Sequence, residues 1–151
     1  MDISGQFEIP ADRQQVWDAL NDPDVLARCI PGCESIERTS ETEFTAKMKA
    51  KIGPVKARFV SKILLSDLDP PKSYTITGEG KGGPAGFGKG SAHVTLTPAG
   101  DNTILEYTAD MKVGGKLAQV GSRLVGGAVR KIADDFFGKF AEVVTEPVGS
   151  G

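Results

Sequence analysis

The chain has 151 residues, of which 39% are hydrophobic and 25% are charged. This size and composition predict one globular domain with a single core rather than a disordered or fibrous chain. The formal net charge of -2 excludes the strongly basic footprint of a general nucleic-acid binder, and no apolar run approaches the roughly 20 residues of a membrane span. No basic stretch followed by an apolar one opens the sequence, so no signal peptide is predicted and a cytoplasmic protein is expected.

The two cysteines do not predict a disulfide framework or a metal site. Cys29 and Cys33 lie close together in sequence, and His93 is the single histidine, so no four-ligand zinc set can be assembled. Both thiols are expected to be reduced. Neither a metal nor a covalently bound cofactor is predicted.

The N-terminal segment predicts a strand followed by two short helices. Apolar residues alternate with polar ones along 3–9, which is typical of a half-buried strand. Asp12 is suited to cap a helix that ends near position 21. Asp22 and Pro23 then begin a second short helix that is expected to run through Leu26.

From residue 34 to about residue 113 the sequence predicts a meander of antiparallel strands. The clearest signal is the hairpin at 44–63, in which apolar and basic residues alternate around a turn at Gly53 and Pro54. At 116–144 the apolar period changes to 3.6, which predicts one long helix. This order of elements indicates an α+β fold in which a curved sheet wraps the long helix.

Glycines are concentrated at 78–90, where seven occur. Two phosphate-binding patterns can be traced through them, but neither leads into a helix whose N-terminus could hold a phosphate. Two interpretations remain, namely a flexible hairpin connection or a mobile lid over a cavity mouth with Phe87 as its only large apolar residue.

Gly121, Gly126 and Gly127 fall inside the predicted long helix, where a glycine costs about 1 kcal/mol relative to alanine. They either let the helix approach the sheet closely or leave space beside it for a ligand.

No catalytic constellation is visible in the sequence. His93, Glu106 and Asp110 alternate with inward-facing residues, so their side chains are expected on the solvent face of the sheet. Tyr107 is the one inward residue with a titratable group, and it is either a core residue or one that orients the polar end of a ligand. A nucleophile with a base within reach cannot be assembled from the remaining residues, so an enzyme is not predicted.

The hairpin at 44–63 carries a row of basic side chains with no acidic residue among them. By strand alternation all of them point to one face, where they either form a solvated surface that guards the sheet against edge pairing or dock on an anionic surface. We call this set the basic stripe; its members are Lys47, Lys49, Lys51, Lys56, Arg58 and Lys62.

Several segments along nearly the whole chain share a pattern with one known family. They are residues 7–10 followed by 16–20, then Ile30-Pro31-Gly32-Cys33, the glycine segment through Gly86-Phe87, and above all GGKLAQVG at 114–121 with ADDFF at 133–137. On these residues the chain resembles the family of the G subunit of carbon monoxide dehydrogenase, in the START/Bet v 1-like (SRPBCC) superfamily. The resemblance implies a helix-grip fold, in which about seven antiparallel strands grip a long C-terminal helix and two short helices follow the first strand. It also implies a cavity for lipids and other apolar molecules between the sheet and the helix.

The same resemblance implies a role. It is that of a non-catalytic accessory protein of a molybdenum hydroxylase of the carbon monoxide dehydrogenase type, which binds a respiratory quinone or lipid and aids membrane recruitment of the enzyme. A ligand-free adaptor and, further away, a cyclase-like or dehydratase-like enzyme are the alternatives. Some family members continue into a C-terminal hydrophobic anchor, whereas this sequence stops at Gly151, so peripheral contact at the inner face of the cell membrane is expected. One domain is predicted at 1–144, followed by a flexible tail at 145–151.

The expected ligand cavity lies between the sheet and the long helix. Its wall is predicted to consist of Phe44, Met48, Phe59, Tyr107, Met111, Leu117, Gly121, Leu124 and Ala128, with Phe87 at the mouth.

Overall fold

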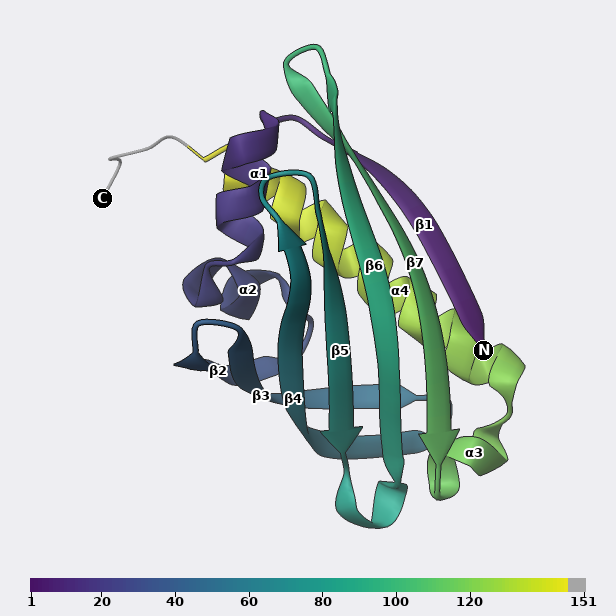
Figure 1. The fold of residues 1–151 in the computed structure, drawn as a ribbon. Coiled ribbons are helices and arrows are strands. Elements are labelled where there is room, and N and C mark those ends of the chain that lie inside the picture. The colour runs from purple at the N-terminus through teal and green to yellow at the C-terminus, as the bar shows by residue number, and fades with distance from the viewer. Residues whose placement is uncertain (147–151) are drawn as a thin grey trace.

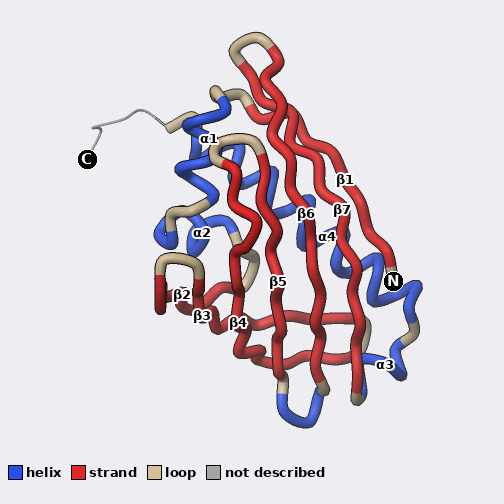
Figure 2. Tube along the Cα trace, viewed as in Figure 1, coloured by secondary structure: helices blue, strands red, loops and turns tan. Residues whose placement is uncertain are grey.

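The computed structural model describes residues 1–146. A seven-stranded antiparallel sheet, in the order β1-β7-β6-β5-β4-β3-β2, curves around a long C-terminal helix (Figures 1 and 2). The elements are β1 (Asp2–Ile9), α1 (Arg13–Leu20), α2 (Pro23–Cys29), β2 (Cys33–Ser40), β3 (Glu43–Ile52), β4 (Val55–Asp69), β5 (Ser73–Lys81), the 3-10 helix η1 (Gly83–Ala85), β6 (Phe87–Ala99), β7 (Asn102–Gly114), α3 (Lys116–Val120) and α4 (Ser122–Val144). The predicted α+β helix-grip architecture is confirmed.

The two short helices begin where the sequence predicts. The backbone N–H of Gln15 donates a hydrogen bond of 2.8 Å to the carboxylate of Asp12, which caps α1. Asp22 caps α2 with its side chain in the same way. This second helix continues to Cys29 instead of ending at Leu26, so its predicted end is wrong.

The sheet has two faces with different chemistry. Strands β3 and β4 pair in unbroken register from Glu43 opposite Leu64 to Ile52 opposite Val55, so the predicted hairpin is confirmed. Because side chains alternate along a strand, the apolar positions of this hairpin face the helix and the lysines face away from it. We call these the inner and outer faces of the sheet.

The apolar side chains form two separate clusters. The larger cluster joins α1, the end of α4 and one half of the sheet, and Val16, Leu105 and Phe140 are fully buried in it. The smaller cluster lies at the other end of the molecule and contains Leu117 of α3 and Val125 of α4. The cavity described below is lined by residues of the smaller cluster, among them Phe59, Leu117 and Val125.

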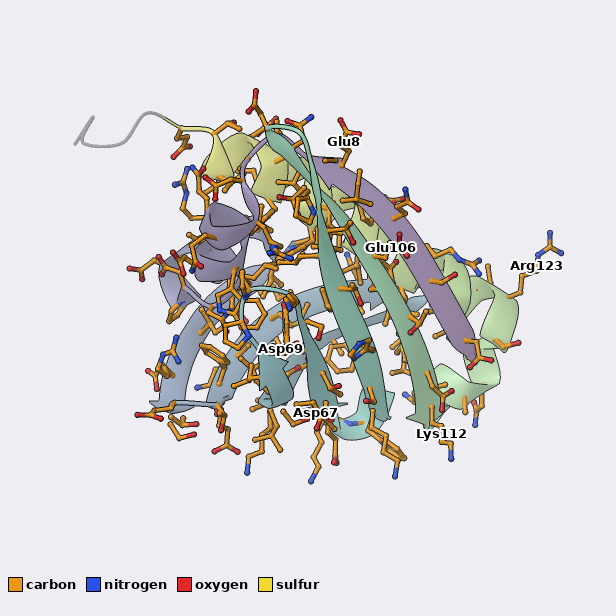
Figure 3. All side chains as sticks on the ribbon, turned by 45° about the horizontal axis from the view of Figure 1, so that its top comes forward. Glu8, Asp67, Asp69, Glu106, Lys112 and Arg123 are labelled. Atoms are coloured by element: carbon orange, nitrogen blue, oxygen red, sulfur yellow. The ribbon has the colours of Figure 1, made fainter. Side chains whose placement is uncertain are left out.

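The predicted long helix is broken at Gly121, so its predicted continuity is wrong. The residue has a φ of 99°, a conformation that L side chains rarely adopt and that glycine tolerates. Helix α4 starts immediately afterwards, and the side chain of Arg123 projects into solvent from its first turn (Figure 3). The short helix α3 therefore has its own orientation, independent of the apolar stripe of α4.

Glycines inside α4 offer a test of helix stability. A Cβ added at Gly127 or at Gly138 would meet no atom within 4 Å. We therefore expect Gly127→Ala and Gly138→Ala each to raise the free energy of unfolding by about 1 kcal/mol in urea titrations. Gly121→Ala serves as the opposite control and should lower it, because alanine disfavours a φ of 99°.

Tyr74 is buried on the inner side of β5, so the prediction that Tyr107 is the one inward titratable residue is wrong. Its burial predicts a stability loss in alkaline solution. Its ring meets Trp17 edge to face at 5.2 Å, and burial raises the pKa of its hydroxyl. Below the ordinary tyrosine pKa of about 10 the hydroxyl is neutral in both states, whereas above it the unfolded chain ionises first and is favoured. We expect stability to fall as the pH rises through this range, and less so for Tyr74→Phe. A midpoint of urea unfolding that depends equally on pH in both proteins would contradict this.

The end of α4 is tied back to α2. Arg28 donates two hydrogen bonds, of 2.9 and 2.6 Å, to the carboxylate of Glu146 and so holds the pKa of that carboxyl below its ordinary value. The tail predicted at 145–151 lies outside the described residues from position 147 onward. Within positions 1–146, no helix has both the length and the apolar character needed to cross a bilayer.

Candidate functional site

An apolar cavity of about 210 Å³ lies between the sheet and the first half of α4. Strands β3 and β4 supply one wall, β5, β6 and β7 the facing wall, and α3 and α4 the cover. Its side chains come chiefly from Met48, Ala50, Ile52, Phe59, Met111, Val113, Leu117, Val125, Val129 and Ile132.

Four glycines form the floor of this cavity. Gly78 pairs directly with Gly90, and Gly80 pairs directly with Gly88, across β5 and β6. Strand alternation places all four on the inner face, so two neighbouring cross-strand pairs present no side chain toward α4. We call these four residues the glycine floor.

The glycine floor corrects the interpretation of residues 78–90 as a hairpin connection or lid. Most of the glycines in this segment belong to the regular strands β5 and β6. Only residues 82–86 connect the two strands, and they include η1. A Cβ at Gly78 or Gly88 would approach no atom closer than 3.8 Å, so these two positions leave space. At Gly90 a Cβ would come within 2.6 Å of the backbone oxygen of Asp110, so that glycine permits close strand packing instead.

The cavity lining contains little that could do chemistry. Ser61 carries the one polar side chain on its inner wall, since Lys89 lies between two inward glycines and directs its side chain to the outer face. Among the described residues that line the cavity none is Asp, Glu, His, Cys or Tyr. The arrangement can enclose an apolar group, and it offers no acid–base pair for proton transfer.

Four of the predicted wall residues line this cavity. Met48, Phe59, Met111 and Leu117 face it from β3, β4, β7 and α3. The inward orientation of the three strand residues follows from alternation, which is the pattern on which they were selected.

Phe44 and Tyr107 do not line the cavity, and their predicted places in its wall are wrong. Phe44 is 1% exposed within the larger cluster, where the guanidinium of Arg38 lies 4.8 Å from its ring centre. Tyr107 packs parallel to Phe7 and Phe137 at the edge of the same cluster. Burial raises the pKa of the Tyr107 hydroxyl, with a smaller contribution in the same direction from Asp134. The two rings face inward on the part of the sheet that the end of α4 covers.

The remaining four predicted wall residues are also misplaced. Leu124 is 56% exposed and Gly121 is the exposed break itself, because α4 starts with a new register after the break. Phe87 is 40% exposed on the outer face, since its neighbour Gly88 takes the inward position. Ala128 lines a separate groove of about 230 Å³ between β3 and α4, which also contains Ala50 and Ile132 of the cavity wall.

The glycine floor and the place of Ser61 in the cavity wall were not predicted. A signal for both was present: glycines recur with a period of two on each side of a short turn, at 78 and 80 and again at 88 and 90. Two strands without inward side chains predict a hollow wherever they pair. Ser61 shares the inward side of the hairpin with Phe59 by the same alternation, but it was not assigned to the cavity wall.

The polar residues expected on the solvent face lie there. His93, Glu106 and Asp110 face away from the helix, and Figure 3 shows Glu106 projecting outward from β7.

Cys29 and Cys33 are free thiols whose pKa values are raised by burial. Positions 1–146 contain no cluster of His, Cys, Asp or Glu that could hold a metal ion.

The members of the basic stripe lie on the outer face. Lys49 lies directly opposite Arg58, and Lys51 directly opposite Lys56. Like charges in directly opposed positions destabilise a sheet, and the nearest acids compensate only Arg58 and Lys62, through Glu34 at 3.2 Å and Glu43 at 3.5 Å. The remaining four members make no ion pair with another described residue.

The outer face is polarised along β6 and β7. Lys89 and Lys112 lie opposite each other and extend the positive region across the sheet, whereas Glu106 lies toward the other end of β7 (Figure 3). A hollow of about 680 Å³ lies among these exposed lysines. It is larger than the inner cavity, but it is open to solvent and lined mostly by charged and polar side chains, with the exposed Val60 and Leu64 among them, so we place the candidate ligand site on the inner face.

A curved antiparallel sheet that encloses an apolar cavity against a long helix defines the helix-grip class. Two solved structures share this fold at low sequence identity. The Zhui aromatase/cyclase from Streptomyces sp. R1128 has a TM-score of 0.71 at 14% identity over 100% of this chain and 98% of its own. A START superfamily protein from Mycobacterium smegmatis has a TM-score of 0.72 at 13% identity over 95% and 96% of the two chains.

The chain belongs to the CoxG family, that of the G subunit of carbon monoxide dehydrogenase, whose model matches residues 5–145. A conserved protein from Geobacillus kaustophilus is similar at 34% identity, with a TM-score of 0.90 and coverage of 95% of each chain. No protein of curated function matches the sequence. The predicted family resemblance is thereby confirmed.

Proposed function

We propose that this protein is a non-catalytic accessory protein that binds a respiratory quinone or a similar lipid in the inner cavity. In this role it acts with a molybdenum hydroxylase of the carbon monoxide dehydrogenase type, aids membrane recruitment of that enzyme, and contacts the membrane through the basic stripe. The observation that carries the proposal is the glycine floor, because it creates apolar space where a filled core would be more stable.

The size of the cavity limits which part of the ligand it receives. Pockets for drug-sized ligands measure roughly 300–1,000 Å³, so about 210 Å³ accommodates a ring rather than a complete isoprenoid lipid. The groove between β3 and α4 shares Ala50 and Ile132 with the cavity and offers a path for the chain. In this arrangement the ring lies over the glycine floor and the chain leaves beside Lys49 and Lys51 of the basic stripe.

The family name supports the accessory role, since it is that of one component of carbon monoxide dehydrogenase. The aromatase/cyclase with the same fold makes an enzyme the second candidate. The lining of the described cavity favours binding over catalysis, because Ser61 has no base beside it that could activate it as a nucleophile. Assembly with a molybdenum hydroxylase can be tested by co-purification with and without added quinone.

Native mass spectrometry of the purified protein tests the ligand directly. We expect the native protein to carry an adduct. After organic extraction, the mass of the released molecule should identify a quinone or another prenyl lipid. Ala128→Phe places a ring in the groove between β3 and α4, so it should remove chain-bearing ligands while short ring compounds still bind. A protein that carries no apolar ligand and takes up none from lipid extracts would contradict the proposal and favour the ligand-free adaptor.

A further inference from the structure

One hydroxyl group faces the glycine floor. Ser61 lies on the inner face of β4, between Ala46 of β3 and Gly80 of β5. A Cβ added at Gly80 would come within 3.0 Å of the Ser61 Oγ, so the missing side chain is what leaves this oxygen uncovered. Among the described residues the Oγ has no hydrogen-bond partner, and it is not sealed from the cavity.

Ser61 is half-buried, and its hydroxyl is free of protein partners within residues 1–146, so its donor and acceptor positions are open to a group that enters the cavity. The neighbouring inward positions on β3 and β4 are all apolar, among them Met48, Ala50 and Phe59. The chain could fill position 61 with alanine at no steric cost, as it does directly across at Ala46. Neither packing nor a hydrogen bond within the protein therefore requires a serine at this position.

We propose that Ser61 is the specificity-determining residue of the cavity, whose hydroxyl hydrogen-bonds a ring oxygen of the ligand above the glycine floor. This inference rests on the proposed function and adds the residue that would select a ring with an oxygen on its leading edge over a plain hydrocarbon ring. A serine hydroxyl both donates and accepts. It donates to the carbonyl of a quinone and accepts from the hydroxyl of the quinol, so the site retains both redox forms of one carrier.

The test compares two probes of nearly the same shape. The first is 2-methyl-1,4-naphthoquinone, and the second is 2-methylnaphthalene, which lacks both oxygens. Ser61→Ala should weaken binding of the quinone by about fivefold and leave binding of the hydrocarbon unchanged. Ser61→Thr keeps the hydroxyl and should restore the affinity for the quinone. Ser91→Ala, which removes a hydroxyl from the outer face of β6, is the matched control and should affect neither probe.

The outcomes separate this inference from the function on which it rests. If both probes bind and Ser61→Ala weakens neither, or weakens both equally, Ser61 is not the anchor, although the cavity still binds apolar rings. If neither probe binds to the unmodified protein, both the anchor and the proposed function are overturned. Repeating the titration anaerobically with the reduced probe should give the same loss for Ser61→Ala, and an effect restricted to one redox form would overturn the dual role of the hydroxyl.

Discussion

Gly78→Leu is expected to weaken ligand binding by at least tenfold, or about 1.4 kcal/mol, while the protein remains folded. The new side chain would project from the glycine floor toward α4 and occupy the space proposed for the ring. Its Cβ meets only the backbone oxygen of Lys62, at 3.8 Å, so the strand accepts it without displacement. Glycine weakens a strand interior and the cavity lacks packing partners, so the thermal midpoint should stay the same or rise.

Thr77→Leu provides the matched control for this prediction. It introduces the same side chain one residue earlier on β5, where alternation directs it to the outer face. Binding measured by fluorescence or native mass spectrometry should be unchanged in this variant. Equal binding by Gly78→Leu and the unmodified protein would place the ligand outside the cavity.

Changing Lys47, Lys49 and Lys51 together to glutamate is expected to abolish association with anionic vesicles at physiological salt. Each lysine near an anionic bilayer contributes about 1 kcal/mol, so removing three weakens binding by about two orders of magnitude before the added repulsion is counted. The structure adds a second expectation for this variant. Glutamate at positions 49 and 51 would face Arg58 and Lys56, converting two repulsive pairs into attractive ones, so the stability should not fall.

Sedimentation with vesicles of phosphatidylglycerol and phosphatidylcholine measures this association. Changing the same three lysines to arginine preserves the charge and should preserve binding, while raising the salt concentration should release the unmodified protein. If binding does not depend on salt, or if the glutamate variant binds equally well, the basic stripe is only a solvated surface and does not bind the membrane. Loss of a protein partner with no change on vesicles would instead identify an acidic protein as its target.

The fold could be predicted because its signals are local. Alternation along 44–63 defined a hairpin, and its confirmed register puts Met48 and Phe59 inside and the basic stripe outside. The capped starts of α1 and α2 were equally local, since Asp12 and Asp22 bond to backbone groups within three residues. Each of these features depends on residues that are neighbours in sequence.

The candidate site could be predicted only in part because an inward residue lines a cavity only where no other element covers it. Phe44 and Tyr107 point inward as expected, yet the end of α4 and its aromatic side chains fill the space beside them. Leu124 was assigned to the wall by extending the apolar period of Leu117 through Gly121. The left-handed backbone of that glycine interrupts the period, and the side chain points into solvent.

Which face of the sheet each strand residue occupies was already readable from the amino-acid order, because alternation is a property of the backbone. The outward position of the six basic residues was readable in the same way. The family was readable from the resemblance of several sequence segments, and the match over residues 5–145 confirms it. The place of the cavity, in contrast, depends on how distant segments pack. Its floor exists because β5 and β6 pair Gly78 with Gly90 and Gly80 with Gly88, and its cover exists because α4 starts anew after Gly121. Strand register and helix placement are long-range packing outcomes, so periodicity within one segment does not reveal them.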